Sequence, residues 1–250
     1  MKKVGLAFSL LVLILSSCSS SDSETTSTSD LLVKKAIVTT AEGSLITLYS
    51  YDGKKITGST SNDVSLNDYT YTGDLITTIK HVINGVVSNI TSYEYNSSNQ
   101  LITSISEESE PAEVTKKTYV YNVDGTISVT VLKGETEDDL VPFNTQNIYF
   151  IDNSINKIEI TNAGSAAINR IINLAYDAKN NPFKNVIGYD KLLLVESSLN
   201  NNVEYRIVNT PGVTTNYIST YVYDTNDFPL ASLKSAGSTA SNVTTEFFYE

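Results

Sequence analysis

The sequence contains no tryptophan, and among its 250 residues there is one cysteine and one histidine. With a single cysteine, Cys18, no intramolecular disulfide can form. Cys18 and His81 together cannot supply the ligands of a tetrahedral zinc site. Any Ser–His–Asp arrangement would depend on His81, and no Gly-x-Ser-x-Gly motif is present. We therefore assign no catalytic residue, no metal site and no cofactor.

Positive charge is also scarce. The chain has 17 lysines and arginines against 28 aspartates and glutamates, so its formal net charge is −11, and removal of Lys2 and Lys3 with a signal peptide would make it −13. An acidic chain without a basic cluster repels phosphate backbones, because nucleic-acid binding rests on cationic contacts to phosphate. Nucleic acid is therefore not an expected partner.

Long apolar runs are missing, except near the N-terminus. The chain opens MKKVGLAFSLLVLILSSC, with a basic start and an apolar stretch over residues 4–15. A membrane-spanning helix needs roughly 20 apolar residues, so this shorter stretch indicates a secretory signal. Leu15-Ser16-Ser17-Cys18 resembles the lipobox of bacterial lipoproteins, which implies cleavage before Cys18, acylation of Cys18 and a membrane anchor. An ordinary signal peptide with a chance cysteine is the alternative.

A small, polar and acidic stretch, SSSDSETTSTSD, follows this cysteine. It has too little apolar surface to repay its ordering entropy. We therefore expect a signal peptide over residues 1–17, an acylated cysteine and flexible tether over residues 18–30, and one folded domain over residues 31–250.

The residues after the cysteine bear on location. Ser19 is not the aspartate that retains enterobacterial lipoproteins at the inner membrane. Asp22 and Glu24 resemble the acidic signals that send Bacteroidota lipoproteins to the cell surface. The expected location is the outer membrane, with the lipid-anchored body on the periplasmic side or at the cell surface.

What the sequence has in abundance is a repeated tyrosine phrase. An aromatic residue, any residue and a second aromatic residue are followed by Asp, Asn or Thr, a turn and an apolar pair. The phrase begins at Tyr49, Tyr69, Tyr93, Tyr119, Tyr149, Leu174, Tyr221 and Phe247. Residues two apart share one face of a strand, and Asp, Asn and Gly after it favour a tight turn. Each phrase therefore predicts a strand, a turn and a second strand.

These hairpins predict an all-β fold, a large antiparallel meander of about 14 to 16 strands. A sheet of more than about 10 strands curls or closes, and closure removes exposed edges. The final stretch, residues 244–250, is expected to pair with residues 34–40. We expect a closed or strongly curled barrel. It is not expected to span a membrane, because its strands look shorter than the roughly 9–11 residues required and charges interrupt both faces.

The phrase resembles the YD repeats of RHS-type proteins, although the usual arginine before the aromatic pair and the Asp-Pro of the return strand are absent. The chain is more similar to Bacteroidota lipoproteins of unknown function with tandem tyrosine-rich hairpins, including the group with a porin-like fold. Residues 176–194, YDAKNNPFKNVIGYDKLLL, look like a recurring segment of those flavobacterial lipoproteins. The resemblance implies an envelope location and a porin-like barrel, and offers no catalytic residue to carry over.

One step between phrases is much longer than the others, 47 residues from Leu174 to Tyr221. A long insertion in a hairpin array is a plug, a lid or an extra hairpin. Asn181-Pro182 favours the start of a short helix. We place the candidate ligand-binding residues here, and they are Phe183, Lys184, Asn185 and Tyr189. The alternative is that these side chains only pack over a barrel mouth.

Two recurring features have a structural and a functional interpretation. The paired tyrosines either form a core or present a ladder to sugars and other flat ligands, and repeated phrases favour the core. Aspartates recur after the strands at Asp52, Asp152, Asp177 and Asp224. They either bind a hard cation such as calcium or close Asx-turns, and the presence of Asn or Thr in other copies favours turns.

The function that fits these observations best is binding or scaffolding by a lipid-anchored envelope protein without enzymatic activity. The ligand is a glycan, a peptide or another envelope protein. Two alternatives stay open. One is an envelope hydrolase that uses a carboxylate pair brought together by the barrel, and the other is a structural or adhesive surface protein.

Overall fold

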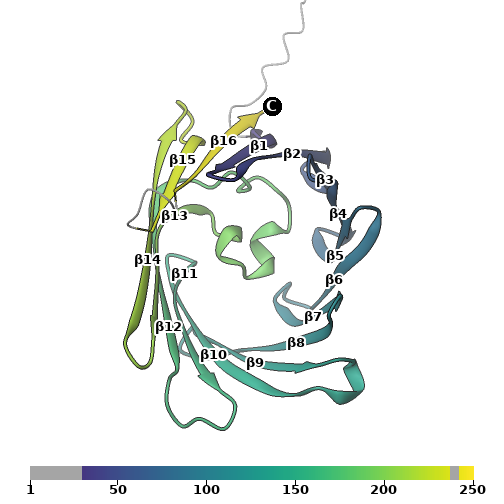
Figure 1. Cartoon of the computed structure of the whole chain (residues 1–250), viewed down its shortest axis with the longest axis vertical. Helices are drawn as coiled ribbons and strands as arrows, with labels where there is room; N and C mark the ends of the chain where they lie inside the picture. Colours follow the sequence, from purple (N-terminus) through teal and green to yellow (C-terminus); the bar gives the residue numbers. More distant parts are fainter. Residues whose placement is uncertain (1–29, 237–241) are drawn as a thin grey trace, which may run out of the picture.

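Sixteen strands pair in sequence order, each antiparallel to its neighbours, and the last pairs with the first (Figure 1). The computed structural model describes residues 30–236 and 242–250. The strands are β1 (Val33–Thr40), β2 (Gly43–Asp52), β3 (Lys55–Ser61), β4 (Ser65–Thr72), β5 (Leu75–Ile83), β6 (Val86–Tyr95), β7 (Leu101–Ser109), β8 (Ala112–Tyr121), β9 (Ile127–Gly134), β10 (Val141–Ile151), β11 (Ser154–Asn162), β12 (Arg170–Asn180), β13 (Asn200–Asn209), β14 (Val213–Tyr223), β15 (Pro229–Ser235) and β16 (Val243–Tyr249). Short 3-10 helices are η2 (Glu137–Asp139), η3 (Tyr189–Leu192) and η4 (Val195–Ser197).

The closure of the barrel confirms the expected pairing of the two ends of the domain. Ala36 of β1 lies opposite Phe247 of β16, and Thr39 lies opposite Thr244. On its other side β1 pairs with β2. The sheet therefore has no terminal edge strand, which removes the main route by which an all-β protein pairs with other chains.

The turns that follow even-numbered strands all lie at one end of the barrel, because the chain runs up and down without a crossover. We call it the tyrosine end, since the tyrosine phrases lead into these turns. Both ends of the domain also lie there, where Leu32 and Glu250 exchange two backbone hydrogen bonds of 3.2 and 3.1 Å.

The paired tyrosines face the interior. In β2, residues alternate between exposed and half-buried, so Tyr49 and Tyr51 point inward while Leu48 and Ser50 point outward. The same alternation holds in β4, where Tyr69 and Tyr71 are half-buried and Thr70 is exposed. The period-two spacing thus correctly predicts the inner face of these strands.

Several of these tyrosines also join neighbouring hairpins. Near the tyrosine end, the hydroxyl of an even-numbered strand donates a hydrogen bond to a backbone carbonyl of the preceding strand, a contact that we call a tyrosine bridge. The donor–acceptor pairs are Tyr51–Val33 (2.8 Å), Tyr95–Ile76 (2.9 Å), Tyr221–Asn202 (2.9 Å) and Tyr249–Pro229 (2.8 Å). The repeated phrase therefore encodes a connection between hairpins as well as a buried ring.

The register of the phrase at residue 149 differs from the one that the sequence suggests. Tyr149 lies opposite Lys157 on the outer face, and its hydroxyl donates to Glu159 at 2.8 Å. Ile148 is buried and Phe150 packs against the core, so these two residues occupy the inward positions. The alignment at this copy is wrong by one residue, because which residue of an aromatic pair faces inward is set by the pairing of β10 with both neighbours.

The strands are longer than expected: ten of the sixteen have 9 to 11 residues, so strand length does not argue against a barrel that spans a membrane. The expected charges are present on the outer face, at mid-strand positions. Asp68 of β4 lies opposite Lys80 of β5, and the two form an ion pair of 2.9 Å. Lys157 and Glu159 form another on β11, also at 2.9 Å. Among residues 30–236 and 242–250, no helix has the length and hydropathy to cross a bilayer.

Candidate functional site

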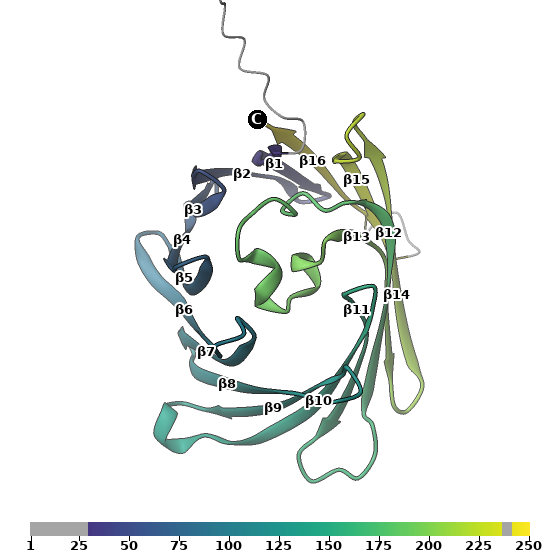
Figure 2. The same cartoon turned by 180° about the vertical axis from the view of Figure 1, so that it is seen from behind.

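The long step between phrases forms a plug inside the barrel. The plug, residues 181–199, connects β12 to β13 and lies within the ring of strands (Figures 1 and 2). Its buried Val186 and Leu192 pack with Ile56 and Ile76 of the wall. Of the three forms expected for this insertion, the plug is the one that the structure has.

The plug begins with a turn and not with a helix. The Asn181 side chain accepts a hydrogen bond from the Phe183 amide at 2.8 Å, and the Lys184 amide donates to the Asn181 carbonyl at 3.1 Å. Helical structure first appears at Tyr189. The expected helix start at Pro182 is wrong, because the Ile187 amide donates to the Lys54 carbonyl of the wall and not to the Phe183 carbonyl, so the turn is not continued into a helix.

Backbone contacts fasten the plug to the turns after β2 and β4. The Ile187 amide donates to the Lys54 carbonyl at 3.0 Å, and the Tyr71 hydroxyl donates to the Ile187 carbonyl at 3.1 Å. Gly188 has a φ of +76°, and a Cβ there would clash with the Asp74 carbonyl oxygen. A glycine is required at this point because both the conformation and the close approach exclude a side chain.

The four candidate residues of the plug have different surroundings. Phe183 stacks on Tyr189 with ring centroids 5.0 Å apart and meets the edge of Tyr49 at 5.3 Å. Burial raises the pKa of Tyr189, so this ring stays neutral. The Asn185 side chain donates to the Leu31 carbonyl at 2.9 Å. Tyr189 and Asn185 thus hold the plug in place, while Phe183 reaches a cavity.

The fourth candidate, Lys184, lies at the surface. Its Nζ donates to Asn180 Oδ1 at 2.5 Å. This contact joins the plug to the end of β12.

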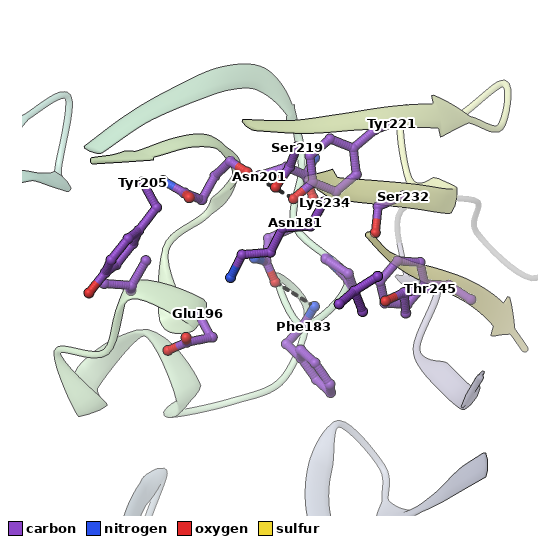
Figure 3. A pocket seen from close by; sticks show the side chains of 15 residues that line it. Asn181, Phe183, Glu196, Asn201, Tyr205, Ser219, Tyr221, Ser232, Lys234 and Thr245 are labelled. Carbon is purple, nitrogen blue, oxygen red and sulfur yellow. Dashed lines mark hydrogen bonds between the residues drawn. The ribbon is translucent and has the colours of Figure 1, made fainter. Parts of the chain in front are cut away.

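A cavity of about 490 Å³ lies between the plug and the wall formed by β13 to β16 (Figure 3). Its volume falls within the range of about 300–1,000 Å³ that is usual for ligand sites. Aromatic rings come from the plug and from three strands, and they are Phe183, Tyr205, Tyr221 and Phe247.

Polar groups line the same cavity between those rings. Amides are supplied by Asn181 of the plug and by Asn202 of β13, and hydroxyls by Ser219, Ser232 and Thr245. Aromatic faces interspersed with amides and hydroxyls can hold a polar ligand in a fixed orientation. The strand residues of the lining alternate with outward residues, so the pairing of β13 to β16 brings them together, and the plug adds its own side chains from the other side.

The cavity contains one basic and one acidic side chain. The Lys234 Nζ lies 4.9 Å from the ring centroid of Tyr217 and 5.9 Å from that of Tyr205. Glu196 extends from the plug on the Tyr205 side (Figure 3). Burial, followed by the negative charge of Glu196, raises the pKa of Tyr205.

A second cavity of about 540 Å³ lies on another side of the plug, against the turns after β6 and β8. Its lining includes Tyr121, Phe150 and Gln100. Its two charged residues, Asp190 and Lys191, form an ion pair of 2.7 Å with each other. The charges in this second cavity are therefore already neutralised within the protein.

Neither of these two cavities has the carboxylate pair that the hydrolase hypothesis needs. Asp152 and Asp177 both line a third, smaller cavity of about 260 Å³ at β11 and β12, where Asp177 already accepts a hydrogen bond from the Tyr223 hydroxyl. The lining of the first contains one carboxylate, Glu196, and the lining of the second contains one, Asp190. His81 faces the interior, where its Nδ1 is 2.8 Å from Asn67 Oδ1. Within the described residues, no three His, Cys, Asp or Glu side chains gather closely enough to hold a metal ion.

Several of the acidic turn residues close Asx-turns. Asp224 Oδ1 accepts hydrogen bonds from the amides of Asn226 and Phe228, both at 2.8 Å. Asp177 Oδ1 accepts from the Lys179 amide at 2.9 Å. These contacts confirm the turn interpretation at both positions. The predicted lipidation site, Cys18, lies outside the described residues.

The cavity residues Glu196, Tyr205 and Lys234 were not singled out from the sequence. The alternation of apolar and charged residues in β13 is a usable signal for Tyr205. In β15 the alternation points the other way, because Leu233 lies outward and Lys234 lines the cavity. Nothing in the sequence places Glu196, because its position depends on how the plug sits in the barrel.

Two solved structures share this fold. The first is a porin-like protein from Bacteroides vulgatus ATCC 8482, with 17% sequence identity and a TM-score of 0.62 over 88% of this chain and 99% of that chain. The second is a porin-like protein from Bacteroides uniformis ATCC 8492, with 9% identity and a TM-score of 0.54 over 87% of this chain and 98% of that chain. No protein-family model and no curated protein sequence matches the chain. At these identities the similarity establishes the barrel fold.

Proposed function

We propose that this protein is a lipid-anchored envelope protein that binds a small ligand inside its barrel. The observation that carries the proposal is the cavity of about 490 Å³ between the plug and β13–β16. The lipobox that ends at Cys18 supports the anchor, and the fold shared with porin-like proteins supports the envelope location.

The charged side chains on the outer face favour a barrel that lies outside the bilayer. Charged side chains on a lipid-facing strand are costly near the bilayer midplane. Here the pairs Asp68–Lys80 and Lys157–Glu159 lie on the outer face of β4, β5 and β11. With the protein outside the bilayer, the lipid on Cys18 is the attachment, and the interior is left for binding.

The plug favours ligand binding inside the barrel over passage of solutes through it. Its apolar residues pack against both core clusters of the wall, with Val186 and Leu192 in one and Val195 against the other. A segment held by core packing and backbone hydrogen bonds divides the interior into cavities. The cavities have the size and mixed lining of ligand sites.

Two substitutions at adjacent positions of β14 test the cavity. Ser219 lines it, whereas Thr220 is exposed on the outer face. We expect a panel of oligosaccharides and short peptides to include a ligand that raises the melting temperature of the full chain in mild detergent. Ser219→Trp, which fills the cavity, should abolish that shift, and Thr220→Trp should keep it.

Two results would count against the proposal. One is a panel without any shift in the wild-type chain, and the other is an equal shift in Ser219→Trp. In cells, incorporation of a labelled fatty acid that persists in Cys18→Ser would refute the anchor.

A further inference from the structure

The first cavity is lined by two side chains of opposite charge. Lys234 and Glu196 are its charged lining residues. Among the described residues, neither takes part in an ion pair. The second cavity differs, since Asp190 and Lys191 neutralise each other at 2.7 Å. The first cavity is thus the one with charges available to a ligand.

Both charged side chains are solvent-exposed, and aromatic rings lie beside them. The Lys234 ammonium lies against the rings of Tyr217 and Tyr205, and the Glu196 carboxylate is close enough to Tyr205 to influence its ionisation. A ligand that enters displaces water from both charged groups. A charge that loses its water needs a counter-charge or several hydrogen bonds, because desolvation is costly otherwise.

One class of molecule supplies both counter-charges. A free amino acid or short peptide carries a carboxylate at one end and an ammonium at the other. The apolar residues Phe183, Val243 and Phe247 line the same cavity and can receive an uncharged side chain. The side-chain oxygen of Asn202 can accept a hydrogen bond from a peptide N–H, since its amide nitrogen already donates to the Ala175 and Glu204 carbonyls.

We propose that this cavity binds a zwitterionic molecule of the size of a dipeptide, with its carboxylate at Lys234 and its ammonium at Glu196. The proposal rests on the proposed function and names its ligand class. A neutral sugar would leave both charges without counter-charges, which is why the zwitterion is favoured over a glycan.

The test compares ligands that differ by one charge. The dipeptide Ala-Phe, its N-acetylated form, its C-terminal amide and the neutral sugar maltose are titrated into the full chain in mild detergent by calorimetry. A charge-assisted hydrogen bond contributes roughly 1.5–3 kcal/mol, so each capped peptide should bind about tenfold or more weakly than Ala-Phe. Maltose should bind more weakly still.

Two substitutions test which residue binds each end of the peptide. In Glu196→Gln, Ala-Phe and its N-acetylated form should bind equally, while the preference for a free carboxylate remains. In Lys234→Met, the preference for a free carboxylate should disappear and that for a free amine should remain. Control substitutions on the outer face, Lys116→Met and Glu204→Gln, should change neither preference.

The outcomes separate the two proposals. If Ala-Phe and both capped forms bind equally, and Ser219→Trp abolishes this binding, the zwitterion proposal is wrong. The cavity would then still be a ligand site. Binding of maltose in preference to Ala-Phe would also overturn the zwitterion proposal and identify a sugar site. Binding that is unaffected by Ser219→Trp would overturn both proposals.

Discussion

At the scale of single residues, the tyrosines have two separable roles. Their rings fill the interior, and the hydroxyls of some of them form bridges between hairpins, as Tyr95 does to the Ile76 carbonyl at 2.9 Å. Tyr176 of β12 occupies an equivalent inward position near Ser198, but within the described residues its buried hydroxyl makes no hydrogen bond of acceptable geometry. Both rings lie in the interior, but only the Tyr95 hydroxyl forms a hydrogen bond that stabilises the fold.

We therefore expect the replacement of tyrosine by phenylalanine to reduce stability at residue 95 but not at residue 176. Tyr95→Phe should lower the free energy of unfolding by about 1 kcal/mol, because it removes a hydrogen bond and leaves the Ile76 carbonyl unpaired. Tyr176→Phe should leave it unchanged or raise it, because it removes a buried polar group that has no partner. Thermal unfolding followed by circular dichroism measures both. Equal destabilisation by the two substitutions would contradict the bridge.

At the scale of elements, one of the contacts that hold the plug against the wall is a close backbone approach at Gly188. Gly188 lies against the Asp74 carbonyl in the turn after β4, next to the hydrogen bond from Tyr71 to Ile187. Gly85, in the turn between β5 and β6, has nearly the same φ of +78° but open space around it. The two glycines therefore share the conformational requirement and differ in the close approach.

Alanine at each glycine separates these effects. Gly85→Ala should cost about 1–2 kcal/mol, the penalty of a left-handed conformation for an L-residue. Gly188→Ala should cost more, since the added Cβ also pushes the plug away from the β4–β5 turn. Melting temperature measures the cost, and limited proteolysis within residues 181–199 should be faster in Gly188→Ala alone. An equal proteolysis rate in both variants would show that the contact does not hold the plug.

At the scale of the whole molecule, the closed barrel keeps inward-facing tyrosines such as Tyr49 and Tyr71 away from water. Burial, with a smaller effect of Tyr69, raises the pKa of Tyr49 from 10.0 to about 12. Burial also raises the pKa of Tyr71 to about 12. Protons are therefore held more tightly by the folded barrel than by the unfolded chain.

Because the folded state holds these protons more tightly, we expect the protein to lose stability at alkaline pH. Because the raised pKa values favour the neutral phenol in the folded state, their contribution is complete below pH 10 and is lost as pH rises from 10 toward 12. Circular dichroism and the absorbance of tyrosinate, undisturbed by tryptophan in this chain, should change together. Tyr49→Phe should reduce the steepness of the loss. Tyrosinate formation well before unfolding would contradict the buried position of these rings.

The sequence by itself determined the strands and their inner faces. Tyr49 and Tyr51 are two residues apart and are followed by a turn signal, and these local properties decide strand, reversal and face before any distant residue takes part. Closure could also be foreseen, because so large a meander leaves two edges and the chain ends in a strand.

The tertiary structure alone decided the rest. Tyr149 carries the same phrase but faces outward, because its orientation depends on the pairing of β10 with both β9 and β11. Lys234 and Glu196 line one cavity because β15 forms part of its wall and the plug, which is fastened to the turns after β2 and β4, carries Glu196. Short-range alternation is set by the covalent geometry of neighbouring residues, whereas contacts across the interior depend on how the closed barrel and the inserted segment fit together.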